Sequence, residues 1–315
     1  MRIPVSFFSI AVGTLAWGQI WQAAALVWTA PAWVVSFASA WGLAVWLVLL
    51  VAYVYKTCAQ PQAVRDEFNH PVQSATTALL PVSTLLAAIT LQSWLPELAK
   101  GLLVFTLLAQ LLLGLWLTGR FWQGGRSPES INASVYIPSV AQNFVAATAC
   151  VHFGWSTLAG LFLGAGLFSW LALDSMVMAR AATLAPLEPA QRPMQGIQIA
   201  PAFVGGLSYL ALTSGPPDLL VLMLFGYGLY QGLLAIRQLP WTLQAAFAPS
   251  YWAFSFGVMA MANMVLRMWA RAPDEALWQV LAPLLFVFAN GVFLVLLWHT
   301  ARLGFQGRLI PGPSK

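Results

Sequence analysis

Charged side chains are scarce in this sequence of 315 residues. Asp, Glu, Lys and Arg together make up 7% of it, whereas a soluble domain has about 25%. Hydrophobic residues make up 60%, and the mean hydropathy is +0.77. So little polar surface cannot cover a globule in water, and we expect a single integral membrane domain over residues 1–315, surrounded by membrane lipid. The excess of 14 basic over 9 acidic residues is small, so we expect no nucleic-acid partner.

Cysteine and catalytic motifs are nearly absent as well. The two cysteines, Cys58 and Cys150, are too few for a disulfide framework and too far apart for a CxxC metal site. The sequence has no HExxH, GxSxG or Walker pattern, and no pair of carboxylates lies within an apolar segment. We therefore predict that the protein is not an enzyme and has no catalytic residue, cofactor or metal site.

Long apolar runs dominate the sequence instead. A membrane-spanning helix needs about 20 apolar residues. Ten segments approach or exceed this length: 4–24, 33–55, 73–93, 98–119, 136–153, 155–178, 195–213, 217–238, 249–269 and 276–303. The links after the odd-numbered segments are short and nearly uncharged. We therefore predict an all-α membrane fold of ten transmembrane helices, arranged as five helical hairpins.

Basic residues are distributed unevenly over the links. Eleven of the fourteen fall at the termini and after the second, fourth, sixth and eighth segments: Arg2, Lys56, Arg65, Arg120, Arg126, Arg180, Arg192, Arg237, Arg302, Arg308 and Lys315. The other three, Lys100, Arg267 and Arg271, fall on the opposite side. The positive-inside rule then predicts that both termini of this multi-pass protein lie in the cytoplasm.

Prolines distinguish the odd-numbered segments from the even-numbered ones. Pro4, Pro81, Pro138, Pro201 and Pro249 lie one to each odd segment, inside it or at its cytoplasmic start. Proline interrupts helix hydrogen bonds, and lipid cannot satisfy the carbonyls that it frees. We predict kinks at the last four of these prolines, an inner ring of five odd helices that forms a pore, and an outer layer of five even helices. An ordinary packed bundle is the alternative.

The apolar stretch Ser250–Met264 places small residues between phenylalanine and methionine side chains. Because residues three or four apart share a helix face, Ala253, Phe256, Gly257 and Ala260 form a narrow surface interrupted by one ring. This face predicts a pore wall lined by the three small residues, with a constriction at Phe256. Rings at helical spacing also pack between helices, so packing is the alternative role for this phenylalanine.

Ionisable residues are almost absent from the predicted pore helices. No odd segment has an acidic residue in its core, and only Arg267, near the outer end of the ninth, reaches into one. Coupled carriers usually keep an ionisable residue or an unwound helix near the midplane. The neutral pore therefore favours anions, with Arg267 and Arg271 attracting them at the outer mouth. Asp174 has two readings: an interface residue paired with Arg180, or a coupling-ion site.

Six short motifs occur in order along the chain: HPV at 70–72, YIPSVAQNF at 136–144, GAGLFSW at 164–170, GIQIAPAF at 196–203, FGYG at 225–228 and WAFSFG at 252–257. In these motifs the chain resembles the tellurite-resistance/dicarboxylate transporter family, which also includes the slow anion channels of plant guard cells. The resemblance runs over nearly the whole chain.

The resemblance implies a homotrimer of ten-helix protomers in the bacterial inner membrane, each with its own pore. It also implies that a phenylalanine of the ninth helix closes the pore, and the WAFSFG motif places this residue at Phe256, with Phe254 as the second choice. One departure concerns Asp174 and Ser175, where close bacterial relatives tend to have Glu-Pro. A role tied to that glutamate therefore does not carry over directly.

These observations together predict a channel for small anions of the chloride and nitrate class, gated by a phenylalanine. The alternative is a secondary transporter of dicarboxylates, or an exporter that confers resistance to tellurite or other toxic compounds, as the names in the family suggest. The neutral pore favours the channel. A membrane scaffold is a third class, which the proline-bearing inner helices disfavour.

Overall fold

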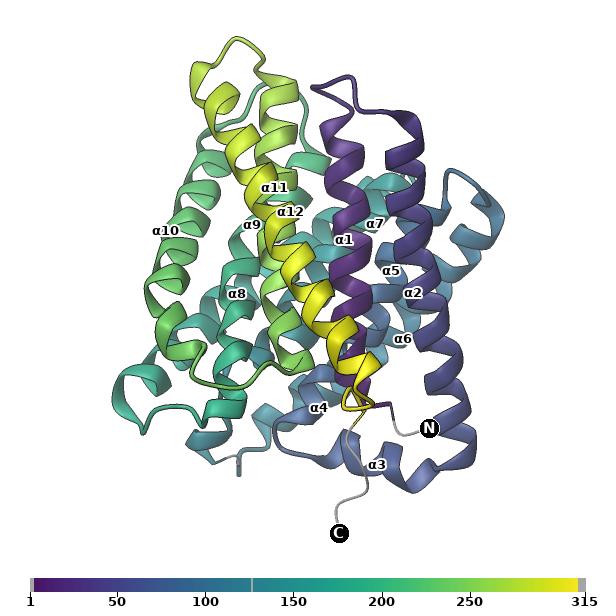
Figure 1. The fold of residues 1–315 in the computed structure, drawn as a ribbon, viewed down its shortest axis with the longest axis vertical. Coiled ribbons are helices and arrows are strands. Elements are labelled where there is room, and N and C mark those ends of the chain that lie inside the picture. Colours follow the sequence, from purple (N-terminus) through teal and green to yellow (C-terminus); the bar gives the residue numbers. More distant parts are fainter. Residues whose placement is uncertain (1–2, 126, 311–315) are drawn as a thin grey trace.

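The computed structural model describes residues 3–125 and 127–310, and all regular secondary structure in these two ranges is helical. The longest helices run side by side (Figure 1). The α-helices are α1 Phe8–Ala24, α2 Ala32–Ala59, α3 Pro61–Asn69, α4 Gln73–Thr76, α5 Leu79–Leu91, α6 Pro96–Trp122, α7 Gln142–His152, α8 Ser156–Thr183, α9 Ala200–Leu212, α10 Leu219–Thr242, α11 Ala253–Arg271 and α12 Ala276–Phe305. Short 3₁₀ or π segments are η1 Val5–Phe7, η2 Pro128–Ser130, η3 Ala133–Tyr136, η4 Ile137–Ala141, η5 Pro189–Ile199 and η6 Pro249–Trp252. The predicted all-α class is confirmed for the described residues, and Arg2, Arg126 and Lys315 lie outside them.

Eight helical segments of the described chain are long and apolar enough to cross a membrane. Two further predicted spans, 4–24 and 195–213, contain α1 and α9, which have 17 and 13 residues and are not among the eight. Repeated apolar helices of this length are the architecture of a multi-pass membrane protein. The count of ten spans stays a prediction.

The long helices fall into a buried and an exposed group. In α2, α6, α8, α10 and α12, only 17–28% of the most apolar window is buried, against 67–83% in the segments that contain α5, α7 and α11. Most residues of α1 and α9 are buried as well. The buried helices contact one another in a closed cycle, in the order α1, α5, α7, α9, α11 and back to α1. Each also contacts the exposed helix that follows it, and the exposed helices turn large apolar side chains outward.

Prolines lie where the buried helices begin or change type. Pro81 is the third residue of α5, Pro201 the second of α9, and Pro249 the first of η6. Pro138 lies in η4, a single π turn that leads into α7. In the first turn of a helix, the N–H that proline lacks would have no partner within the helix. These four prolines therefore mark first turns and changes of helix type, and the kinks predicted at them stay a prediction.

The helix α3 lies where the apolar pattern predicts only a link. It follows α2 directly, at the end of the molecule where α1 begins and α12 ends (Figure 1). Four of its nine residues are Gln, Arg, Asp and Glu, so no apolar run of span length marks it. Its Glu67 is buried against α2, and this contact holds the helix to the bundle.

Two glycines let α11 approach its neighbours closely. A Cβ atom at Gly257 would lie 2.9 Å from the backbone nitrogen of Ala200, at the junction of η5 and α9. A Cβ atom at Gly13 of α1 would lie 2.8 Å from the Cβ of Ser255 in α11. Real Cβ atoms do not come so close to other heavy atoms, so only glycine allows these contacts. They fix α11 between α1 and α9.

Candidate functional site

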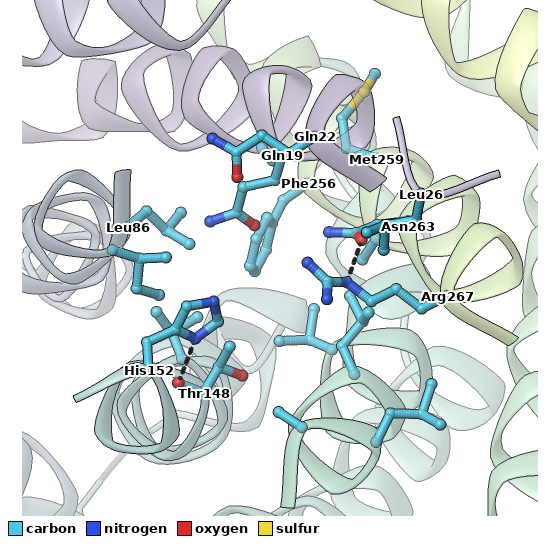
Figure 2. A pocket seen from close by; sticks show the side chains of 18 of the residues that line it. Gln19, Gln22, Leu26, Leu86, Thr148, His152, Phe256, Met259, Asn263 and Arg267 are labelled. Atoms are coloured by element: carbon cyan, nitrogen blue, oxygen red, sulfur yellow. Dashed lines mark hydrogen bonds between the residues drawn. The ribbon is translucent and has the colours of Figure 1, made fainter. Parts of the chain in front are cut away.

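Two cavities lie among the buried helices. The arginine cavity has a volume of about 140 Å³ and is lined by residues of α1, α5, α7, α9 and α11, among them Arg267 and Arg271. The glutamate cavity has a volume of about 360 Å³ and is lined by the first turns of α1, α5, α9 and α11, by η4, η5 and η6, and by residues around α3 that include Glu67. Of the residues that the structure describes, Phe256 alone lines both. The two cavities therefore meet at this ring, which Figure 2 shows from the arginine cavity.

One face of α11 runs through both cavities. Ala253 lines the glutamate cavity, Phe256 lines both, and Ala260, Asn263 and Arg267 line the arginine cavity. These residues are three or four positions apart, so they share one side of the helix. The helix face predicted from Ala253, Phe256 and Ala260 therefore lines the two cavities.

Two other predicted residues of α11 lie elsewhere. Gly257 packs against Ala200, and neither cavity includes it in its lining. Phe254 packs against Gly196 of η5, where an added Cβ would lie 2.7 Å from the Cγ of the ring. The structure therefore gives Phe256, and not Phe254, the position between the cavities.

The arginine cavity is positively charged. Arg267 donates from Nε to Asn263 Oδ1 at 2.8 Å, and its Nη groups have no hydrogen-bond partner in the described part of the chain. Arg271 donates to the backbone carbonyl of Leu210, which ties it to the end of α9. No described Asp or Glu is part of the lining. Because the walls are otherwise neutral and largely apolar, a small anion in this cavity is attracted by both arginines.

The glutamate cavity has one acidic residue in its described lining, and the charge of this residue is paired. Glu67 Oε1 accepts from Lys56 Nζ at 2.6 Å and from the backbone N–H of Val5 at 3.2 Å, while Tyr53 donates to Oε2 at 3.1 Å. Lys56 also donates to the carbonyl of Ile3 at 3.1 Å. The side chains of the ion pair are 5% and 10% exposed. The pair therefore contributes little net charge to the cavity.

Asp174 of α8 lies outside the linings of both cavities. Its carboxylate accepts from the hydroxyls of Tyr136 at 2.8 Å and Tyr227 at 3.2 Å, and Gln231 donates to the oxygen of Tyr227 at 2.7 Å. The described residues contain no ion pair between Asp174 and Arg180. The reading that paired these two side chains is therefore wrong, because two tyrosines supply the donors that a partly buried carboxylate needs.

Five polar residues in the described lining of the arginine cavity were not among the residues predicted from the sequence. They are Gln19 and Gln22 of α1, Thr148 and His152 of α7, and Asn263 of α11. The two glutamines lie three residues apart in an otherwise apolar segment, which is a weak signal of a polar face. Nothing in the local pattern around His152 indicates that its ring faces a cavity.

Comparison with known proteins matches nearly the whole chain. The model of a family described as SLAC1, voltage-dependent anion channel, matches residues 2–301, which include all the residues that line the two cavities. A protein of Haemophilus influenzae described as a tellurite resistance protein TehA homolog is 33% identical over 262 residues, which are 83% of this chain and 80% of that protein. The resemblance carried by the six motifs is thereby confirmed. The chain belongs to the SLAC1 voltage-dependent anion channel family, and its role is anion transport across a membrane.

Proposed function

We propose that this protein is an anion-selective channel, in which small anions of the chloride and nitrate class pass through a pore in each protomer and Phe256 closes that pore. The observation that carries the proposal is the position of Phe256 as the one described residue shared by the two cavities. An ion moving from one cavity to the other has to pass this ring. The closed cycle of five buried helices supports a path enclosed by protein on every side.

The charge of the path supports anions over cations. The arginine cavity has two arginines and no described carboxylate in its lining. The glutamate cavity has one carboxylate in its described lining, and Lys56 neutralises it. Cation channels typically place carboxylates in the path, whereas basic residues at a pore mouth raise the local concentration of anions.

The partial burial of Phe256 supports a gate that moves. Its ring is neither fully buried nor fully exposed, and it borders empty volume on two sides. A ring in a close-packed core has no room to turn, because protein interiors contain few voids. Here the neighbouring cavities give the ring space into which it turns when the pore opens.

The alternative function is a secondary carrier of dicarboxylates or an exporter of tellurite. The name of the Haemophilus influenzae relative points toward tellurite resistance. A proton-coupled carrier requires a titratable group that alternates between the two sides. Asp174, the acid that would be a candidate, lies outside both cavities and is held by two tyrosines.

We further propose the arrangement of the channel in its membrane. The resemblance to bacterial relatives favours the bacterial inner membrane. The distribution of basic residues favours an orientation with both termini in the cytoplasm, so that the arginine cavity opens to the outside. The resemblance to the family favours a homotrimer. Native mass spectrometry should then give the mass of three chains of 34.2 kDa.

The test is Phe256→Ala in planar lipid bilayers with chloride and nitrate gradients. Truncation of the ring should raise anion conductance by about tenfold or more, which corresponds to removing about 1.4 kcal/mol from the barrier. If Phe256 only packs, its truncation should instead cost about 3–5 kcal/mol of stability and open no current. Saturable proton-dependent uptake of a dicarboxylate, without current, would favour the carrier.

Phe254→Ala is the matched control, because it truncates the same side chain two residues away on the same helix. Its ring packs against Gly196 and borders neither cavity. This variant should lose stability without gaining conductance. If the Phe256→Ala protein is stable and trimeric but conducts no better than the parent, the proposal that Phe256 closes the pore is wrong.

A further inference from the structure

His152 is a titratable side chain of the arginine cavity to which the proposed channel assigns no role. It is the last residue of α7, and its ring projects into the cavity (Figure 2). The residue is exposed, so the ring borders open space and not the packed core. Gln92 donates to the backbone carbonyl of His152 at 2.7 Å, which holds this end of α7 beside the end of α5. The orientation of the ring is therefore supported by a defined backbone.

The hydrogen bond of Nδ1 determines what His152 presents to the cavity. Nδ1 lies 3.0 Å from the backbone carbonyl oxygen of Thr148. A carbonyl oxygen only accepts, so Nδ1 carries a proton, and the neutral ring presents the lone pair of Nε2 to the cavity. When the ring gains a proton, Nε2 becomes an N–H donor and the side chain carries a full positive charge. The same nitrogen therefore repels an anion in the neutral ring and binds it in the charged ring.

Arg267 of α11 faces His152 across the cavity (Figure 2). Its Nε is held by Asn263, which leaves the Nη donors available on the cavity side. Arg271 is the other charged residue of the described lining, and Gln19 and Gln22 of α1 contribute uncharged amides. The lining residues from α5 and α9 are apolar. Two positive groups that face one another repel, and an anion between them removes that repulsion.

We propose that the arginine cavity binds a small anion between Arg267 and His152, and that this binding is coupled to the uptake of one proton by His152 Nε2 from the adjoining aqueous phase. The inference rests on the proposed function, because the anion bound here is the one that the channel passes. By linkage, acid on this side of the membrane raises the affinity for the anion, and the anion raises the protonation of His152 by the same factor. One linked proton limits the change in affinity to about tenfold per pH unit.

The test is a titration of His152 by nuclear magnetic resonance. The chain has three histidines, so protein labelled with ¹³C at histidine Cε1 gives three ring signals, and the signal lost in H152Q identifies the residue. In lipid nanodiscs, the titration midpoint of His152 is compared in chloride and in gluconate at equal ionic strength. The midpoint should be higher in chloride by about 0.7 pH unit or more, the equivalent of a fivefold coupling. Equal His152 midpoints in the two salts would overturn the proposal.

The other two histidines serve as internal controls. His70 lines the glutamate cavity, and His299 stacks on Phe247 near the end of α12. Their midpoints should be the same in both salts. A shift of all three midpoints would show a general salt effect and would also overturn the site.

Variants of Arg267 test the second half of the site. R267Q should abolish the difference between chloride and gluconate, while R267K, which keeps a positive charge, should retain part of it. If R267Q keeps the full difference in the His152 midpoint between chloride and gluconate, Arg267 is not part of the site. If R267Q does not fold, the titration of the parent protein tests whether anion binding and protonation of His152 are coupled.

The titration needs no ion flow, so its outcome is independent of the channel measurements. A chloride-dependent midpoint without any current would keep the anion site and overturn the channel. Anion currents together with a His152 midpoint that is the same in chloride and gluconate would support the proposed channel and overturn the proposed anion site.

Discussion

At the scale of single residues, the pair of Lys56 and Glu67 places two of the chain's few charges in the interior. Charges that leave water lose several kcal/mol of hydration each, and they recover it only with good geometry and further hydrogen bonds. Here Glu67 receives three donors, and Lys56 reaches the carbonyl of Ile3 and lies 5.4 Å from the ring centre of Tyr53. The bond of Val5 to Glu67 ties the beginning of the chain to α3, and the bond of Ile3 to Lys56 ties it to α2. The pair therefore shapes one wall of the glutamate cavity.

Replacement of Glu67 by Gln should lower the free energy of unfolding by about 3–5 kcal/mol, because the charge of Lys56 then stays buried without its partner. Unfolding in detergent by heat or denaturant measures the loss. The matched control is Asp66→Asn, which changes the neighbouring carboxylate of α3. Asp66 is exposed and its carboxylate accepts only from Gln62 in the described structure, so its change should stay within about 0.5 kcal/mol. Equal losses in both variants would show that burial of the pair is unimportant.

The arginines of the arginine cavity should act through their charge. Replacement of Arg267 and Arg271 by Gln should lower anion conductance much more at about 0.01 M salt than at about 1 M, because the screening length falls from about 30 Å to about 3 Å. Lys100→Gln is the control, since Lys100 is exposed on α6 and lines neither cavity. The same relative loss at both salt concentrations would mean that the arginines matter for packing, for example through the bond of Arg271 to Leu210.

At the scale of elements, α11 is positioned by direct contact with α1 and with the junction of η5 and α9. Gly13 and Gly257 provide the space for these contacts. The position of Phe256 depends on them, because it lies one residue before Gly257 on the same helix. A helix that moved outward by the width of a methyl group would change how far the ring reaches between the two cavities.

Gly257→Ala should destabilise the protein by about 1–3 kcal/mol, the usual cost of overpacking, because the new methyl group meets Ala200 and Ile199. Gly291→Ala is the matched control in α12, where no atom lies within 4 Å of the added Cβ. That variant should be neutral or up to about 1 kcal/mol more stable, because alanine favours the helix. Melting temperatures in detergent compare the two. If Gly257→Ala has the same melting temperature as the parent protein, the close approach of α11 and α9 does not determine the position of Phe256.

At the scale of the whole molecule, the apolar surface of the exposed helices and the one-sided distribution of basic residues predict the orientation in the membrane. Cys58 is exposed near the end of α2, at the same end of the molecule as the start of α1 (Figure 1). Asp274 is exposed in the turn between α11 and α12, at the opposite end. An orientation with both termini inside therefore places Cys58 in the cytoplasm and Asp274 outside.

An impermeant maleimide applied to sealed spheroplasts should label Asp274→Cys in a Cys58→Ser background, and should not label Cys58 in the parent. Cys150 is buried and should stay unlabelled in both. Permeabilised cells are the control, in which Cys58 should become reactive. Labelling of Cys58 in sealed cells, without labelling at position 274, would invert the proposed orientation.

The sequence by itself determined the class of the protein and the positions of its long helices. Length and apolarity of a run depend only on neighbours along the chain, so they are visible without a fold. The shared face of Ala253, Phe256 and Ala260 was visible for the same reason, because helical spacing is local. The helix α3 was missed because it is short and polar, and its stability depends on the burial of Glu67 against α2.

Only the tertiary structure decided which side chains meet in the two cavities. Phe254 and Phe256 are both rings on α11, and it is Gly196 of η5 that accommodates one and leaves the other between the cavities. His152 and Arg267 likewise face each other only because α7 and α11 border the same space. Such encounters depend on contacts between elements far apart in the sequence. The local pattern of each element contains no information about its partner, since any apolar face can pack against many others.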